Sequence, residues 1–221
     1  MGGGEITGAE AQLDGVTAPK QKRSALAFSR VKQAALDLMC DPDTVDFRLA
    51  DVSRAAGVSI GSIYARVQGK AELVRLVQRE ELERLNAELD AIGAEAEGHP
   101  SLEAAADAMV RGYVRALAER ADLLRYLAWV STGDAEIRRQ GRASEQAARG
   151  VFVRVLREAC DRAGIAVADD DLAWCFQLVN GVLAHSLSLN TLRADQPVEL
   201  ENRDGIAGRL SVTIIAFLRR D

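Results

Sequence analysis

The chain has 221 residues, of which 48% are apolar, and this is enough to bury a hydrophobic core in one large domain or two smaller ones. Aromatic residues make up only 5% of the chain, so the core is expected to consist mainly of Ala, Leu and Val, which favours helices over sheets. No apolar run approaches the roughly 18 residues that indicate a membrane-spanning helix, and we expect a cytoplasmic protein.

The charges are distributed unevenly along the chain. The net charge is −5, but residues 20–80 contain 11 Lys and Arg against 7 Asp and Glu. Exposed charges are screened beyond roughly 8–10 Å at physiological salt, so a basic region attracts phosphate locally even on an acidic protein. The overall acidity therefore does not exclude a polyanionic partner.

The three cysteines, Cys40, Cys160 and Cys175, are far apart and lie in apolar, helix-like runs. Their odd number and the absence of C-x-x-C spacing argue against a disulfide framework and against a zinc site. We therefore expect reduced, buried thiols, and we predict neither a metal site nor a cofactor.

The N-terminal third predicts a disordered arm followed by three helices. Residues 1–19 are rich in Gly and show no helical periodicity. A first helix is expected over about 23–40, where apolar residues recur at helical spacing and Pro42 then ends the run. Short helices are expected over 48–56 and 60–67, because Gly57 suits a left-handed C-cap and Ser59 suits an N-cap.

The rest of the chain predicts longer helices. Lys70 opens a helix that reaches about residue 94, and Ser101 caps the next one. Further helices are expected over 123–130, 134–163, 172–190 and 203–220. Since neither strand-like alternation nor an internal repeat is found, the predicted fold class is all-α, with about nine helices.

The segment 51–64 has the pattern of two helices joined by a tight turn. Ser53 is small enough for the helices to cross closely, Gly57 supplies the positive φ of the turn, and Ser59 caps the second helix. Two helices joined by a short, Gly-containing turn form a helix-turn-helix, whose second helix enters the major groove of DNA. The segment therefore predicts a DNA-binding domain.

The stretch from Phe47 to Leu73 resembles the DNA-binding region of the TetR family of bacterial regulators. The family pattern falls on Ala56-Gly57-Val58-Ser59, Ser62, Tyr64 and Lys70. Val67 replaces the usual aromatic residue, and Arg48 replaces the usual Ser or Thr cap, for which Asp46 or the backbone is expected to substitute. The resemblance implies a helix-turn-helix domain over 20–69 and a helical effector-binding and dimerisation domain over 70–221.

The expected DNA-binding residues lie on the two short helices and at the start of the fourth. The resemblance assigns phosphate contacts to Tyr64 and Lys70, and Arg66 suits either a bidentate guanine contact or a phosphate. The alternatives are a packing role for Tyr64 and a solvated charge for Arg66. The basic cluster at 20–23 is either a solvated flank or an arm on DNA phosphates. The predicted set is Arg48, Ser59, Ile60, Gly61, Ser62, Tyr64, Ala65, Arg66 and Lys70.

A palindromic operator requires two copies of the chain, with recognition helices about 34–36 Å apart. The helix expected over 172–190 is apolar nearly all the way round, which favours cover by its own domain on one face and by a partner on the other. The alternative is a helix buried within a monomer. In the family the last two helices form the dimer interface, for which we predict Gly181, Ala184, Ser188, Leu210, Ile214 and Phe217.

The resemblance also implies an effector pocket enclosed by the middle helices. Several of the scarce aromatic residues lie between 113 and 129, which favours a small, mainly apolar effector, although core packing explains each residue as well. Binding is expected to favour a state in which the recognition helices no longer match the groove. The predicted lining is Met109, Tyr113, Tyr126, Trp129, Phe152, Trp174, Phe176 and Asn180.

The predicted function is a sequence-specific DNA-binding transcription regulator, a homodimeric repressor released from its operator by the effector. Two other classes remain open: a helical DNA-binding protein without a ligand, and a small-molecule enzyme. Against the enzyme, no carboxylate pair, metal cluster or nucleophile motif stands out, and His185 lies in the predicted interface helix. We therefore predict that the protein is not an enzyme.

Overall fold

The computed structural model describes residues 17–44, 46–187 and 203–220. The described residues form nine helices and no strand, which confirms the predicted all-α fold. The helices are α1 Thr17–Cys40, α2 Leu49–Ala56, α3 Ile60–Tyr64, α4 Lys70–Glu97, α5 Leu102–Ala118, α6 Ala121–Ser131, α7 Ala135–Arg162, α8 Asp169–Ser186 and α9 Arg203–Leu218. No helix among these residues is both long enough and apolar enough to cross a membrane.

The chain divides into two compact units, Met1–Val74 and Arg75–Asp221. The division falls inside α4, because Leu73 and Val74 are buried in the core of the first unit. The domain boundary expected from the sequence was at residues 69 and 70, just before this helix.

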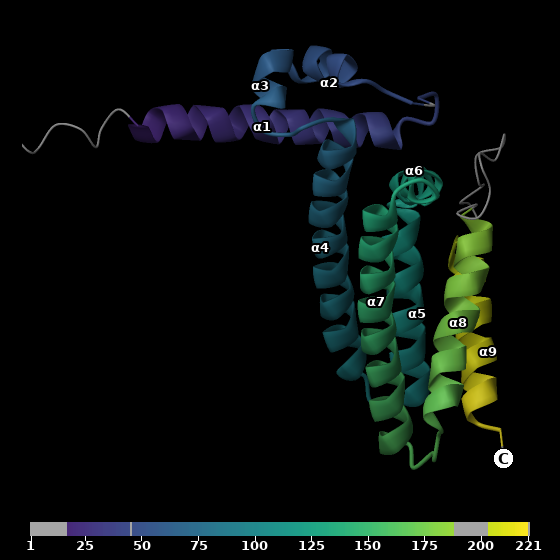
Figure 1. The fold of residues 1–221 in the computed structure, drawn as a ribbon. Coiled ribbons are helices and arrows are strands. Elements are labelled where there is room, and N and C mark those ends of the chain that lie inside the picture. The colour runs from purple at the N-terminus through teal and green to yellow at the C-terminus, as the bar shows by residue number, and fades with distance from the viewer. Residues whose placement is uncertain (1–16, 45, 188–202, 221) are drawn as a thin grey trace, which may run out of the picture. The chain divides into compact units, whose positions relative to one another are not determined.

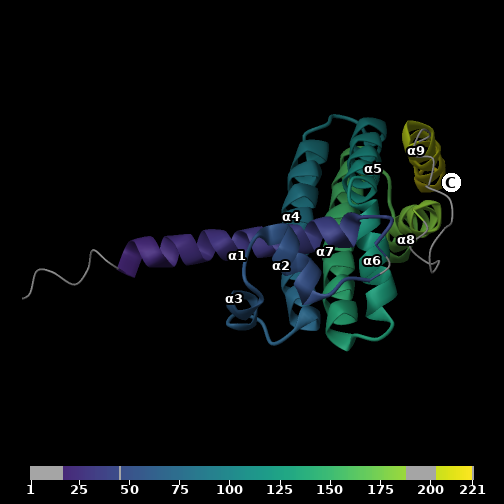
Figure 2. The ribbon, with the colours of Figure 1, turned by 90° about the horizontal axis from the view of Figure 1, so that it is seen from above.

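In the N-terminal unit, α2 packs against α1 and α3 packs against α2, and Figures 1 and 2 show these three helices. Helix α1 begins at Thr17 rather than near residue 23. Pro19 is tolerated there because it lies in the first turn, where a missing N–H costs no intrahelical hydrogen bond. The first 16 residues of the predicted arm lie outside the described part of the chain. The core of the unit consists of Val31, Ala34, Ala35, Met39, Phe47, Leu49, Val52, Ala56, Ile63, Val67, Leu73 and Val74.

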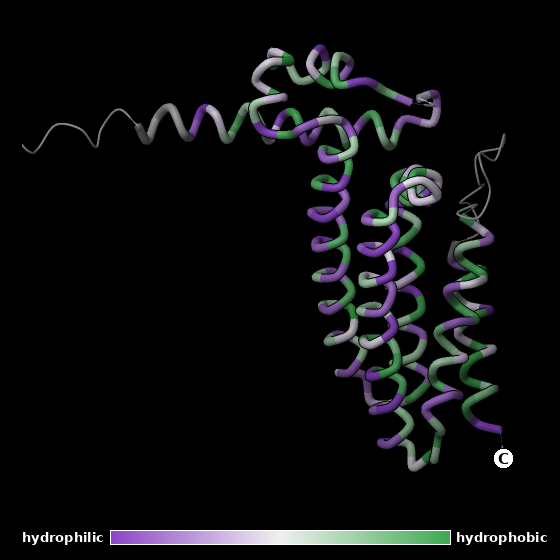
Figure 3. The backbone as a smooth tube through the Cα atoms, in the orientation of Figure 1, coloured by the Kyte–Doolittle hydropathy of each residue, from purple (hydrophilic) through white to green (hydrophobic). Residues whose placement is uncertain are grey.

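In the C-terminal unit, α5 packs against α7 and α9, and α7 also packs against α6 and α8. Figure 3 shows hydrophobic and hydrophilic residues alternating along α4, α5 and α7, as expected for helices that bury one face. Two glycines allow close helix packing. A Cβ on Gly112 would lie 2.4 Å from the Ile92 Cγ2 atom, and a Cβ on Gly93 would lie 2.5 Å from the Val151 Cγ1 atom.

Two helix starts in this unit have side-chain caps and a third does not. The Ser101 hydroxyl accepts a hydrogen bond from the backbone N–H of Ala104, as predicted. The Asp134 carboxylate accepts hydrogen bonds from the N–H groups of Glu136 and Ile137. Three aspartates open α8 with no side-chain cap. Helix α8 ends at Ser186, before the predicted end at residue 190, and residues 188–190 lie outside the described range.

Candidate nucleic-acid interface and candidate ligand cavity

Helices α2 and α3 are joined by the tight turn that the sequence predicts. Gly57 has a φ of 62°, in the left-handed region that favours glycine. The Ser53 hydroxyl donates to the Val58 carbonyl oxygen at 2.6 Å, and the Val58 N–H donates to the Ser53 carbonyl oxygen at 3.2 Å. Ser53 therefore closes the turn by hydrogen bonding, in addition to allowing the close crossing expected of a small residue.

Helix α3 has one buried and one exposed side. Ile63 is fully buried and Val67, just beyond the helix, is 3% exposed. The opposite side presents Ile60, which is 42% exposed, and Tyr64, which is 55% exposed. We call the exposed residues of this segment the α3 surface; they are Ser59, Ile60, Gly61, Ser62, Tyr64 and Ala65.

The start of α3 is fixed by two serines. The Ser59 hydroxyl accepts a hydrogen bond from the Ser62 N–H at 3.3 Å, as expected for an N-cap. The Ser59 and Ser62 hydroxyl oxygens are 2.8 Å apart, so one hydroxyl donates to the other. The acceptor hydroxyl keeps its own proton for a further donor contact, and both residues are exposed.

Two of the three cations predicted to bind DNA, Arg66 and Lys70, have side-chain partners in this unit. The Arg66 guanidinium donates to the Ser24 hydroxyl and lies 4.9 Å from the centroid of the Phe28 ring, both on α1. Arg66 follows the C-cap of α3, because the helix ends at Tyr64 rather than at residue 67. The Lys70 ammonium forms an ion pair with the Asp46 carboxylate, and this interaction lowers the pKa of Asp46.

The start of α2 is capped differently from the expectation. Asp51, three residues into the helix, accepts a hydrogen bond from the backbone N–H of Arg48 at 2.9 Å. Asp46, one of the two substitutes that we expected for the missing cap, the other being the backbone, pairs with Lys70. The Arg48 residue remains exposed.

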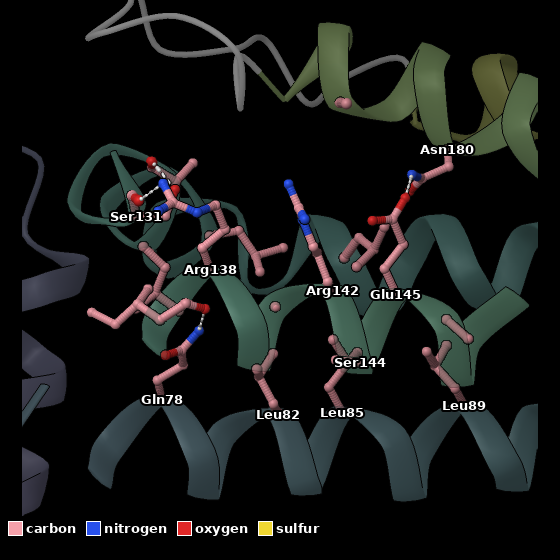
Figure 4. Close-up of a pocket in the computed structure, with 18 of the residues that line it drawn as sticks. Gln78, Leu82, Leu85, Leu89, Ser131, Arg138, Arg142, Ser144, Glu145 and Asn180 are labelled. Carbon is pink, nitrogen blue, oxygen red and sulfur yellow. Dashed lines mark hydrogen bonds between the residues drawn. The ribbon is translucent and has the colours of Figure 1, made fainter. Parts of the chain in front are cut away.

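The C-terminal unit contains a cavity of about 380 Å³, shown in Figure 4. Leucines of α4 line one side, and polar side chains of α7 and α8 line the other. The lining residues are Gln78, Leu82, Leu85, Leu89, Tyr113, Leu117, Leu124, Leu127, Ala128, Ser131, Ile137, Arg138, Gly141, Arg142, Ser144, Glu145, Ala148, Asn180 and Ala184.

A chain of hydrogen bonds crosses the polar side of the cavity. The Tyr113 hydroxyl donates to Asn180 Oδ1 at 2.9 Å, and Asn180 Nδ2 donates to Glu145 Oε1 at 2.9 Å. Burial, followed by the nearby Glu145 charge, raises the pKa of the Tyr113 hydroxyl well above its usual range. Tyr113 therefore stays protonated and acts as a donor throughout the physiological range.

Two of the eight residues predicted to line a pocket, Tyr113 and Asn180, line this cavity. Phe152 and Phe176 fill the core beside Tyr113, with ring centroids 5.7 Å apart, and Met109 is fully buried in the same cluster. The other three predicted residues also lie outside the lining: Tyr126 is buried beside Trp129, and Trp129 and Trp174 are about 40% exposed.

The predicted dimer residues face in different directions. Leu210 and Ile214 are buried in the core of their own unit, where α9 packs on α5, so they are not available to a partner as we expected. Ala184 lines the cavity, Gly181 is exposed, and Ser188 lies outside the described residues.

The last two helices also carry apolar side chains that are exposed. Trp174 of α8 is 41% exposed and stacks on Phe217 of α9, with ring centroids 4.2 Å apart. Val212 of α9 is 68% exposed. Large apolar side chains are therefore accessible on both helices; Trp174 and Val212 were not among the predicted interface residues, whereas Phe217, which stacks on Trp174, was.

Comparison with known proteins finds similarity at the level of structure. No family profile and no curated protein matches the sequence. A Mesorhizobium loti MAFF303099 protein assigned to the TetR family of transcriptional regulators is 13% identical, with a TM-score of 0.73 over 89% of this chain and 96% of its own. A Rhodococcus RHA1 regulatory protein in the TetR family is 15% identical, with a TM-score of 0.62 over 87% and 96%.

A third solved structure is FadR of Bacillus subtilis, a transcriptional regulator in complex with stearoyl-CoA. It is 12% identical to this chain, with a TM-score of 0.62 over 83% of this chain and 97% of its own. Identities this low establish a shared fold, and the fold extends over nearly the whole of each protein.

Proposed function

We propose that this chain, which has the fold of TetR-family regulators, is a homodimeric DNA-binding transcription regulator that represses until a small molecule enters its cavity. The observation that supports this most strongly is the α3 surface. It lies directly after a tight turn, is backed by buried Ile63, and presents short or polar side chains to the outside. A helix of this kind can approach base edges closely in the major groove.

Within the α3 surface, Gly61 leaves the most room for a base pair. A Cβ at Gly61 would meet no protein atom within 4 Å, and Ile60 on the same surface offers an apolar contact for a thymine methyl group. Ser59, Ser62 and Tyr64 supply hydroxyl groups for base edges or phosphates. We propose that the α3 surface reads the operator sequence.

The basic side chains then position the domain on the DNA backbone. Lys70 can exchange its ion pair with Asp46 for a phosphate at little cost, because a solvent-accessible ion pair contributes only about 0–1 kcal/mol. Arg66 is held by Ser24 and Phe28 beyond the end of α3, which favours a phosphate contact over base reading. Arg48, exposed before α2, is proposed to contact the backbone in the same way.

The dimer is proposed to form through the outward sides of α8 and α9. Trp174 and Val212 are large apolar groups exposed there, and exposed Gly181 and Ala216 allow a second copy to approach closely. A partner that covers these residues would bury apolar surface without disturbing Leu210 and Ile214, which stabilise the monomer core.

The cavity is proposed to hold the effector. Its volume falls in the range of sites that enclose drug-sized ligands, and FadR of the same fold is a regulator that holds an acyl-CoA. Helix α4 begins at Lys70 and lines the cavity between Gln78 and Leu89, so ligand contacts and a DNA contact belong to one helix. We propose that α4 has two positions, one that binds DNA well and one that does not. An effector that binds more tightly to the second position would lower DNA affinity, by up to the ratio of its affinities for the two positions.

Mapping of the genomic sites bound by the protein tests the proposal, followed by gel shifts on the mapped sites with specific and unrelated competitor DNA. We expect a few palindromic sites that survive competition by unrelated DNA. Uniform binding to all DNA would favour the ligand-free DNA-binding protein, and a small-molecule reaction without any DNA binding would favour the enzyme. Either outcome would contradict the proposal.

A further inference from the structure

We propose that the cavity selects a carboxylic acid with an unbranched apolar chain, whose carboxylate binds Arg142 and whose chain lies between the leucines of α4, α5 and α6. This inference deepens the proposed function, on which its regulatory meaning rests. The ligand chemistry itself is argued from the cavity alone.

One side of the cavity is built to hold an apolar chain. Three leucines of α4 project into it at successive turns, as Figure 4 shows, and leucines of α5 and α6 complete the surface. A chain that lies against these leucines loses contact with water, so binding is expected to strengthen with each methylene group that is buried. The six leucines are Leu82, Leu85, Leu89, Leu117, Leu124 and Leu127.

The polar side of the cavity has one cation left for a ligand. Arg138 donates to the Ser131 carbonyl oxygen at 2.8 Å, and Glu145 accepts from Asn180. The Arg142 guanidinium, in contrast, has no hydrogen bond or ion pair with any residue that the structure describes. Figure 4 shows it extending from α7 between Arg138 and Glu145, toward the side of α8.

The chemistry of Arg142 points to a single carboxylate. A guanidinium binds a carboxylate through two parallel N–H···O hydrogen bonds, which gives both strength and orientation. Glu145, three residues further along the same helix, adds a negative charge to the lining and disfavours a head group with several charges. A neutral head group can accept a hydrogen bond from the guanidinium but lacks the charge attraction, so it is expected to bind less tightly.

Gly141, next to Arg142, leaves open space in the cavity. A Cβ at this position would meet no protein atom within 4 Å, although Gly141 lies within α7 and lines the cavity. A larger side chain here is therefore expected to occupy the space of the ligand without a clash with the protein. Gly150, also in α7 with open space around it and not part of the lining, is the matched control.

Isothermal titration calorimetry without DNA tests the ligand class, with decanoate, decanol and decanoyl-CoA as probes on the full chain. We expect decanoate to bind roughly 5- to 30-fold more tightly than decanol, because a hydrogen-bonded ion pair at a partly open site is of this order. Equal binding of decanol and decanoate would overturn the role of Arg142. Tighter binding of decanoyl-CoA than of decanoate would overturn the single-charge head group.

Two pairs of variants locate the site. Arg142→Gln is expected to remove the preference for decanoate over decanol, whereas Arg149→Gln, an exposed position on the same helix outside the lining, is expected to keep it. Gly141→Leu is expected to weaken both probes at least tenfold and Gly150→Leu to leave them unchanged. Retained binding in Gly141→Leu, or a retained preference in Arg142→Gln, would overturn the proposed site.

The outcomes also separate this inference from the proposed function. Decanoate binding with no operator binding would refute the regulator and keep the ligand class. Operator binding with no decanoate binding to the wild-type chain would refute the ligand class and keep the regulator. A decanoate complex that left operator affinity unchanged would refute the coupling between the two.

Discussion

The two compact units use their polar side chains in opposite ways. In the N-terminal unit, Ser59, Ser62 and Tyr64 point away from the core, where a large partner can contact them. In the C-terminal unit, Tyr113 and Asn180 turn inward and hydrogen bond across a cavity. The first arrangement suits recognition of an extended polymer and the second suits an enclosed small molecule.

In the N-terminal unit, the residues proposed to bind DNA contribute little to stability. In the C-terminal unit, many residues near the cavity contribute both to ligand binding and to stability. Substitutions on the α3 surface remove few packing contacts, so they should change DNA affinity while the fold stays intact. Substitutions near the cavity change helix packing as well as ligand contacts. The predictions below test this contrast, starting with the largest expected effect.

Gly61→Glu is expected to lower affinity for the mapped operator by about 100-fold or more, because it places a negative charge opposite the phosphates and base edges. The side chain meets open space, so the free energy of unfolding should change little. Fluorescence anisotropy with labelled operator measures the affinity, and urea unfolding measures the stability. Gly150→Glu, equally open but in the C-terminal unit, is the control and should bind normally; equal loss in both variants would indicate a general charge effect.

Gly112→Ala is expected to lower the free energy of unfolding by about 1–3 kcal/mol, because its Cβ would overlap the Ile92 side chain of α4. The control is Gly150→Ala in an exposed part of α7, where alanine should stabilise the helix by up to about 1 kcal/mol. Urea unfolding followed by circular dichroism measures both. If the two variants were equally stable, the close approach of α4 and α5 would be contradicted.

Asp134→Asn keeps a side chain that can cap α7 but removes the ion pair with Arg75, whose guanidinium lies 2.9 Å from the carboxylate. The hydrogen bond from Arg75 holds the pKa of Asp134 below its usual value. The stabilisation is therefore present above the unfolded pKa of about 3.9 and is lost as the pH falls through the lower folded pKa.

We expect Asp134→Asn to cost about 1 kcal/mol at pH 7, and the cost should shrink below about pH 4. Unfolding curves of the variant and the wild type between pH 3 and pH 7 measure the difference. Asp107→Asn, which removes a more exposed pair with Arg111, should cost less. A cost for Asp134→Asn that did not depend on pH would contradict the role of the charge.

Lys70→Ala is expected to weaken binding to all DNA sequences by a similar, modest factor and to reduce the salt slope of the affinity by about 1. The reason is the loss of one phosphate contact, partly offset because the variant has no ion pair between Lys70 and Asp46 to break when DNA binds. Binding titrations between 50 and 200 mM salt measure this, since the slope counts the phosphates contacted. An unchanged slope would show that Lys70 keeps its ion pair with Asp46 when DNA is bound.

Much of the fold and of the α3 surface was predictable because the signals are local. The positive φ of Gly57 and the cap at Ser59 depend on residues within one turn of each other, and both were predicted correctly. The ends of the helices were predicted less accurately than their presence. Helix α3 stops at Tyr64 although the apolar pattern continues to Val67, which is buried just beyond the helix.

A cavity and two of its lining residues, Tyr113 and Asn180, were predicted, but most of the lining was not, because it depends on contacts between distant segments. Leu82, Leu85 and Leu89 have the same spacing as core residues, and nothing in the sequence distinguishes a leucine that faces a cavity from one that faces a neighbouring helix. Phe152 and Phe176, which we predicted to line the pocket, instead fill the core.

The role of Arg142 and the residues of the dimer interface could not be predicted for the same reason. Arg142 and Arg149 look alike in the sequence, and only the tertiary structure places one of them at the cavity. The apolar spacing of Leu210 and Ile214 correctly indicated burial, but it could not show that α5 of the same chain covers them.

The most direct test of the central claim is photocrosslinking of the α3 surface to operator DNA. A photoreactive benzoylphenylalanine is placed at Tyr64 in one variant and at Val212, a somewhat more exposed residue of α9, in another. We predict that the Tyr64 variant crosslinks to the operator in major-groove positions of both half-sites, and that the Val212 variant crosslinks to protein only. Operator binding without any crosslink from Tyr64, or equal DNA crosslinking from Val212, would contradict the account.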